Sequence, residues 1–235
     1  MEGQATKTTR KRNFPRMWGL RRRERSYRER GIHLLAGVDE VGVGPLAGPV
    51  VAAAVIMDEA SAIRGVDDSK KILKAETREE LAREILKQAR AVGIGVARPR
   101  EIDRINIYQA TLKAMSRAVA RLDPGPELVL VDARTIPGID TPQEAHVGGD
   151  ASFYQIACAS IIAKNYRDLL MLRMDRRYPG YGFSHNMGYP TPDHKKALKA
   201  LGPCWIHRRH YRGVAEWWQG DLGSLWNEDD GPETP

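Results

Sequence analysis

The stretch from residue 34 to residue 57, LLAGVDEVGVGPLAGPVVAAAVIM, decides the fold class of this chain. It holds two apolar runs rich in β-branched residues, at 34–41 and 50–57, and this composition is typical of buried strands. Between the runs, Gly42-Val43-Gly44-Pro45 combines residues that interrupt strands and favour sharp turns. The stretch therefore predicts a strand, a tight turn and a second strand.

Helical and strand patterns alternate along the rest of the chain. Four segments carry the apolar spacing or the boundary residues of helices: residues 76–88, 108–122, 152–174 and 192–201. Two short apolar runs, residues 92–96 and 128–131, predict further strands. This alternation predicts an α/β domain with a mixed central β-sheet flanked by helices and a small C-terminal helical region.

Charge is distributed unevenly along the chain. Residues 1–30 hold 11 Lys or Arg and 3 Asp or Glu, a net charge of +8, whereas the whole chain carries +7. We expect residues 1–30 to form a basic arm, disordered or folded as a short surface helix, ahead of a folded domain at 31–226 and an acidic tail at 227–235. A basic arm of this kind is one common way to bind nucleic acid without sequence preference.

Composition argues against several protein classes. Two cysteines, Cys158 and Cys204, are too few for a disulfide scaffold or a cysteine-rich zinc module. Cys204, His207 and His210 have zinc-like spacing but lack an evident fourth ligand. The longest nearly apolar run, residues 44–57, is too short to span a bilayer. No apolar stretch follows the basic N-terminus, so we expect no secretory signal and a cytoplasmic location.

Four acidic residues stand at the ends of predicted elements: Asp39, Glu40, Asp132 and Asp150. Asp39 and Glu40 are neighbours in a predicted strand, so they share one site only if the backbone turns there, as the following glycines permit. Hard cations such as Mg²⁺ and Mn²⁺ prefer carboxylate oxygens. As a pattern alone, acids at strand ends are more often turn residues and helix caps.

Several spaced motifs, taken together, resemble bacterial ribonuclease HII. In chain order they are GVDEVGVGPLAGPV at 37–50, DSKK at 68–71, VD at 131–132, GD at 149–150, ASIIAK at 159–164, RD at 167–168, MGY at 187–189, GPC at 202–204 and IHRR at 206–209. They cover about residues 34–212, and their common order is more specific than any one motif.

The resemblance implies a ribonuclease H-like fold and an endoribonuclease that cleaves the RNA strand of RNA–DNA hybrids. It also implies cutting 5′ of ribonucleotides embedded in duplex DNA, and so their removal from DNA. The family's carboxylates map onto Asp39, Glu40, Asp132 and Asp150, which would hold two divalent ions, Mn²⁺ or Mg²⁺. One ion would activate water, and the other would stabilise the leaving 3′-oxygen.

The resemblance further implies how the substrate is recognised. The turn of Gly42, Val43 and Gly44 would contact the 2′-hydroxyl through its backbone, and Tyr189 would stack against the sugar at the junction. We also predict substrate contacts for Ser69, Lys70, Lys164, Arg208 and Arg209. The loop with Ser69 and Lys70 suits phosphates but is by itself more often only solvated, and Arg208 and Arg209 suit a phosphate backbone or an acidic partner. We expect a monomer with no membrane association, and the sequence does not decide whether the chain contacts a sliding clamp.

Five positions depart from the family's usual pattern. The family normally carries Arg between the two glycines of the turn, where this chain has Val43. The other departures are Ala133 for Gly, Met187 for Lys, Pro190 for Gly and His210 for Ser. None removes a carboxylate, so we predict an active nuclease with altered selectivity for single ribonucleotides. A non-catalytic nucleic-acid-binding protein on the same fold and a basic RNA-binding structural protein are the alternatives.

Overall fold

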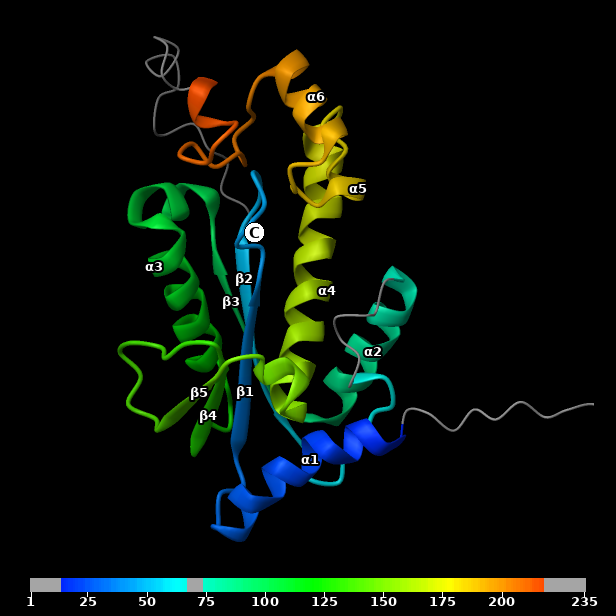
Figure 1. Ribbon diagram of the computed structural model, residues 1–235, viewed down its shortest axis with the longest axis vertical. Coiled ribbons are helices and arrows are strands. Elements are labelled where there is room, and N and C mark those ends of the chain that lie inside the picture. The colour runs from blue at the N-terminus through cyan, green and yellow to red at the C-terminus, as the bar shows by residue number, and fades with distance from the viewer. Residues whose placement is uncertain (1–13, 67–73, 218–235) are drawn as a thin grey trace, which may run out of the picture.

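A five-stranded mixed sheet forms the centre of the computed structural model, which describes residues 14–66 and 74–217 (Figure 1). The strands are β1 (Leu35–Val41), β2 (Val50–Met57), β3 (Ala89–Ala97), β4 (Leu128–Asp132) and β5 (Gln143–His146), in the spatial order β3-β2-β1-β4-β5. β2 is antiparallel to β1 and β3, while β4 pairs in parallel with β1 and β5. The predicted mixed α/β fold is confirmed.

Helices cover both faces of this sheet. The helices of the described residues are α1 (Phe14–Glu29), α2 (Ala75–Gln88), α3 (Pro99–Val119), α4 (Tyr154–Arg177), α5 (Phe183–Asn186) and α6 (Pro192–Leu201). The last two, α5 and α6, lie near the C-terminal end of α4 instead of on a face of the sheet (Figure 1). Figure 1 shows α3 on one face and α4 on the other, with α2 packed beyond α4. In the part of the chain described here, no helix is long and apolar enough to cross a membrane.

Close packing sets α4 directly against β1. A Cβ atom on Gly37 would lie 2.2 Å from the backbone carbon of Gln155, so only glycine permits this approach. Residues 50–57 are buried on both faces, which explains why this strand is apolar throughout instead of alternating. The start of α4 is therefore fixed beside the middle of β1, close to Asp39.

Two elements differ from the sequence prediction for local reasons. β5 is a partly exposed edge strand without an apolar run, so its sequence carries no strand signal. α3 begins at Pro99, nine residues earlier than predicted, and is interrupted at Asn106, whose φ is 67°. The Asn106 side chain accepts a hydrogen bond from the Gln109 N–H (3.0 Å) and restarts the helix.

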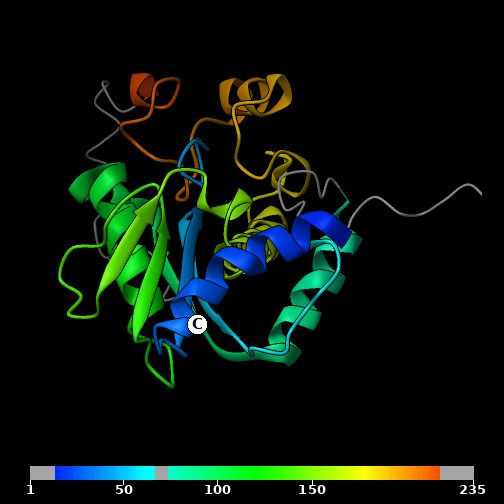
Figure 2. The ribbon, with the colours of Figure 1, turned by 60° about the horizontal axis from the view of Figure 1, so that its bottom comes forward.

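The basic N-terminal segment requires a correction. Over residues 14–29 the structure shows helix α1, the second of the two expected alternatives, but the helix does not lie loosely on the surface, because Leu20, Glu24 and Tyr27 on it are buried. Glu24 accepts a hydrogen bond from the Gln155 N–H (2.8 Å) at the start of α4. Figure 2 shows α1 lying across α4. Its buried residues recur at i, i+4 and i+7, a period that the surrounding arginines conceal in the sequence.

Candidate active site

Parallel pairing of β1 and β4 places two of the predicted carboxylates side by side. The register pairs Val38 with Val131, so the next residues, Asp39 and Asp132, stand at neighbouring positions on the two strands. Because Gly37 packs against α4, Asp39, two residues further along, points to the same face. Asp39 is 7% exposed.

Glu40 points to the other face of the sheet. The strand continues through Glu40 and Val41, which pair with residues of β2, so the expected turn between Asp39 and Glu40 does not occur there. Val38 packs in the core on the α3 side, and alternation directs Glu40 the same way. The two side chains therefore leave the strand on opposite sides, and the turn comes only at Gly42, whose φ is 95°. Because both stand at the end of the strand, the Glu40 carboxylate still lies close enough to Asp39 and Asp132 for the charges to repel one another.

Asp150 approaches from the segment that precedes α4. It is 3% exposed and lies in a short 3₁₀ helix, Gly149–Ala151. The Gly149 N–H donates to Asp132 Oδ1 (2.8 Å), which holds this segment against the end of β4. The structure thus brings Asp150 to the edge where Asp39 and Asp132 stand. Together with Glu40 these residues form the carboxylate cluster.

Burial and mutual repulsion perturb the acids of this cluster. The pKa of Asp39 is raised to about 7, chiefly by burial and also by the Glu40 and Asp132 carboxylates, while a Ser160 hydrogen bond opposes the shift. Burial also raises the pKa of Glu40, against the attraction of Arg134. Asp39 and Glu40 therefore bind protons more tightly than isolated acids do, as expected where a positive charge is favoured.

The donor chemistry of the cluster fits hard divalent cations. Its ligating atoms are carboxylate oxygens, and a divalent ion would offset the repulsion among them. Across residues 14–66 and 74–217, no three His, Cys, Asp or Glu side chains surround a common point. The fit thus rests on the type of donor and the mutual repulsion, not on a formed coordination sphere.

The predicted turn and the predicted aromatic residue come together beside this cluster. The loop of residues 42–48 is joined to the loop of residues 186–191 by a hydrogen bond from the Leu46 N–H to the Gly188 carbonyl (2.8 Å). A Cβ atom on Gly44 would lie 4.0 Å from Cε1 of Tyr189. Val43 is 37% exposed and Tyr189 is 39% exposed, so both are accessible to a ligand.

Two fully buried arginines hold these loops. Arg167 donates to the carbonyls of Pro49 (3.0 Å), Met187 (2.9 Å) and Ala47 (3.2 Å). Burial, with a smaller effect of the neighbouring Arg208 cation, lowers the pKa of Arg167 to about 10. Sequence reasoning missed the role of Arg167, although its Arg-Asp motif was noted.

Arg208 requires a correction, because its side chain is not available to a phosphate. It is 0% exposed, and its guanidinium donates to the carbonyls of Gly42, Val43 and Gly48. The neighbouring Arg209 is half-buried, and its backbone N–H donates to Asp103 Oδ1 (2.9 Å). Arg208 therefore positions the turn instead of contacting substrate.

Of the other predicted substrate-binding residues, Lys164 is held in an ion pair. Lys164 pairs with Asp168 (2.6 Å), which also pairs with Arg78 (3.2 Å). Ser69 and Lys70 lie outside the described residues.

The zinc-like spacing is explained by packing. His207 Nδ1 lies 3.2 Å from Cys204 Sγ, and its Nε2 lies 3.1 Å from Nε2 of the buried His194. The two ring nitrogens of His207 thus face different neighbours, while His210 is exposed. These histidines join α6 to the C-terminal loop.

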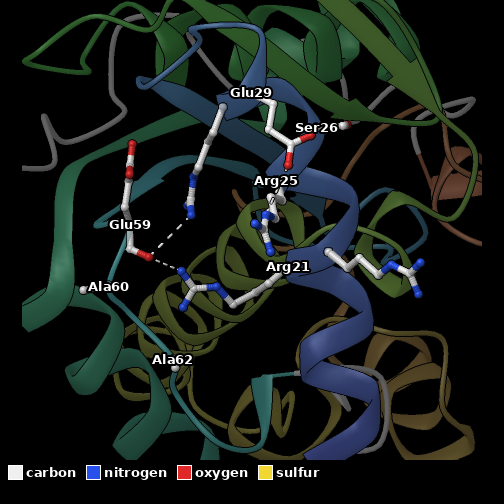
Figure 3. Close-up of a pocket in the computed structure, with 9 residues that line it drawn as sticks. Arg21, Arg25, Ser26, Glu29, Glu59, Ala60 and Ala62 are labelled. Atoms are coloured by element: carbon white, nitrogen blue, oxygen red, sulfur yellow. Dashed lines mark hydrogen bonds and ion pairs between the residues drawn. The ribbon is translucent and has the colours of Figure 1, made fainter.

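A second basic surface lies at the opposite end of the sheet. Arg21, Arg25, Ser26 and Glu29 of α1 face residues 59–62, which follow β2, across an open hollow (Figure 3). Arg21 and Arg28 both donate to the Glu59 carbonyl, and Arg25 pairs with Glu29 (3.2 Å). This hollow is separate from the carboxylate cluster.

Comparison with known proteins gives one consistent family. The sequence model described as Ribonuclease HII matches residues 36–214. Ribonuclease HII from Myxococcus xanthus is 50% identical over 201 residues, which are 86% of this chain and 69% of that protein. Ribonuclease HII from Maricaulis maris is 55% identical over 181 residues, 77% and 82% of the two chains. The crystal structure of ribonuclease H2 from Pyrococcus horikoshii matches with a TM-score of 0.68 at 27% identity, covering 79% of this chain and 97% of that one.

Proposed function

The chain belongs to the ribonuclease HII family and is an endoribonuclease of the ribonuclease H type, and from this premise we propose that it uses two divalent metal ions held by Asp39, Glu40, Asp132 and Asp150. Enzymes of this family depend on divalent metals and act on RNA–DNA hybrids. We further propose cutting 5′ of ribonucleotides embedded in duplex DNA, with Mn²⁺ or Mg²⁺ as the ions, so that the enzyme removes ribonucleotides from DNA.

One observation supports this proposal above the others. Asp39 and Asp132 stand on adjacent parallel strands, the Asp150 segment is hydrogen-bonded to Asp132, and the exposed turn with Tyr189 lies beyond the same strand end. Carboxylates that repel one another beside an exposed, ligand-accessible turn suit a phosphodiester accompanied by cations. When bound, two divalent ions supply an activated water and stabilise the charge on the leaving oxygen.

The chain's own groups orient the acids. The Glu40 N–H donates to Asp39 Oδ1 (2.8 Å), and Ser160 of α4 also bonds to the Asp39 carboxylate. The Gly149 N–H fixes one oxygen of Asp132 in the same manner. Because these donors come from the sheet and from the start of α4, the carboxylates are positioned by rigid elements before substrate arrives.

At the opposite side of the scissile bond, the turn of residues 42–44 would contact the 2′-hydroxyl, and Tyr189 would stack on the sugar. The 2′-hydroxyl is the group by which a protein distinguishes RNA from DNA at one position. Val43 replaces an arginine at this turn, so we propose an active nuclease whose selectivity for single ribonucleotides differs from that of an enzyme with Arg there.

A cleavage assay tests the function. The substrates are duplex DNA with one embedded ribonucleotide, a continuous RNA–DNA hybrid and all-DNA duplex, each with Mg²⁺ and with Mn²⁺. We expect cutting 5′ of the ribonucleotide, at least 100-fold slower in Asp150→Asn and unchanged in Asp140→Asn, an exposed acid on the loop after β4. Cutting of the hybrid alone would show that selectivity has changed. No cutting by folded protein with either metal would favour the non-catalytic nucleic-acid-binding protein.

A further inference from the structure

Arg208 and Tyr211 together hold one side of the exposed turn. Arg208 Nη2 donates to the Gly42 carbonyl (2.5 Å) and Nη1 to the Val43 carbonyl (2.9 Å), while Nε and Nη2 donate to the Gly48 carbonyl (3.0 and 2.9 Å). The Tyr211 hydroxyl also donates to the Val43 carbonyl (2.7 Å). Two consecutive carbonyls of the turn are therefore bound from the protein interior.

This arrangement determines where the next two N–H groups point. In a planar trans peptide, the carbonyl and the following N–H point in opposite directions. Because Arg208 binds the Gly42 and Val43 carbonyls, the N–H groups of Val43 and Gly44 point away from it. Both residues are exposed, and in the described chain no backbone carbonyl accepts from either N–H. Two adjacent donors are thus presented beside Tyr189.

Burying the Arg208 side chain costs free energy, which argues that it has a specific role. Arg208 is fully buried, and the partners of its guanidinium are the carbonyls of the turn and the Tyr211 hydroxyl, which are uncharged. A buried cation without an ionic partner costs free energy that an apolar side chain of similar volume would not. Arg167, buried beside it, adds a second positive charge to the same loop.

We propose that Arg208, assisted by Tyr211, is a positioning residue for ribonucleotide selectivity: it turns two peptide groups so that the Val43 and Gly44 N–H groups donate to the 2′-hydroxyl. This inference rests on the proposed function and extends it. The recognising donors are backbone groups, so the side chain at position 43 is not required for them. Selectivity then depends on a residue 165 positions away in the sequence.

Paired binding measurements test the proposal. In an Asp150→Asn background, which binds without cutting, dissociation constants are measured for a duplex with one ribonucleotide and for the same all-deoxy duplex. Lysine keeps the charge at position 208 but lacks the fork that spans several carbonyls. We expect Arg208→Lys to lower the ribo/deoxy preference about fivefold, the value of one hydrogen bond, and Tyr211→Phe to lower it about twofold.

The ratio separates positioning from simple loss of fold. A partly unfolded variant binds both duplexes more weakly by the same factor and leaves the ratio unchanged. Arg212→Lys, an exposed arginine on the same segment, is the matched control and should keep the ratio of the parent.

Each outcome is decisive. A folded Arg208→Lys with the parent's ratio overturns the proposal. If Arg208→Lys does not fold, an unchanged ratio in Tyr211→Phe overturns it. A parent that binds both duplexes equally would instead refute the proposed reading of the 2′-hydroxyl, and this inference would be refuted with it.

Discussion

Replacing Gly42 by alanine is expected to destabilise the protein strongly, whereas the same change at Gly44 is not. Gly42 has a φ of 95°, and an added Cβ would lie 2.3 Å from Arg167 Nε and 2.7 Å from the Pro49 carbonyl oxygen. At Gly44 the nearest atom to an added Cβ is Tyr189 Cε1, at 4.0 Å, an ordinary contact distance. Gly44→Ala is thus the matched control for Gly42→Ala in the same turn.

The magnitude follows from two contributions. A residue with a side chain in the left-handed region costs about 1–2 kcal/mol. Displacing Arg167 breaks hydrogen bonds in a buried site, at about 1–3 kcal/mol. Gly42→Ala should therefore lose about 2–5 kcal/mol of unfolding free energy, and its Tm should fall by about 4–20 °C. For Gly44→Ala we expect a change below about 0.5 kcal/mol.

Thermal and urea unfolding of the two variants checks this reasoning. If the free energy of unfolding falls with urea concentration at the same slope in both variants, the two unfold between equivalent folded and unfolded states, and their stabilities can be compared. A Gly42→Ala protein whose Tm lies within 2 °C of the parent would refute the argument that Arg167 and the positive φ require glycine. A large loss in Gly44→Ala would refute it equally.

Three further predictions concern selectivity, pH and salt. Val43→Arg should increase the cleavage rate on a duplex with one ribonucleotide, and an unchanged rate in folded protein would contradict the proposed effect of this position. Burial and the neighbouring His194 lower the pKa of His207 to about 4, so the folded state holds His207 neutral. The contribution of neutral His207 to stability is complete above pH 6.5 and is lost as pH falls from 6.5 toward 4. In His207→Gln the free energy of unfolding, measured with urea, should therefore depend less on pH over that range. An unchanged dependence on pH would count against this explanation. The exposed Arg22 and Arg23 should add counterion-dependent affinity, so that Arg22→Gln with Arg23→Gln lowers the salt slope of DNA binding by up to about 2. An unchanged slope would mean that α1 does not contact DNA.

Several features were predictable because their signals are local. The runs at 34–41 and 50–57 contain β-branched and other apolar residues on both sides of a glycine turn, and the strands form there. The order of acidic motifs singled out Asp39, Asp132 and Asp150, which the structure places at one strand end. Such patterns predict strands and turns because the formation of these elements depends mainly on neighbouring residues.

Other features depend on partners that are distant in the sequence. Leu20 and Tyr27 are core residues, but arginines surround them, and only docking onto the sheet and α4 shows which side of α1 is buried. The side on which the Glu40 side chain leaves the strand also depends on tertiary pairing, because the glycines permit a bend after Asp39 that pairing with β2 removes. In each case the deciding contact is with another element.

Arg208 shows this division most clearly. By itself the sequence determined that a cation follows His207, near a motif that resembles a nucleic-acid-cleaving family. The sequence does not show whether the guanidinium of an arginine donates to a phosphate or to a backbone carbonyl. Only the tertiary structure, which buries Arg208 beneath Gly42, Val43 and Gly48, decided that its donors bind the chain itself. The physical reason is that charge is a property of a residue, whereas its partner is a property of the fold.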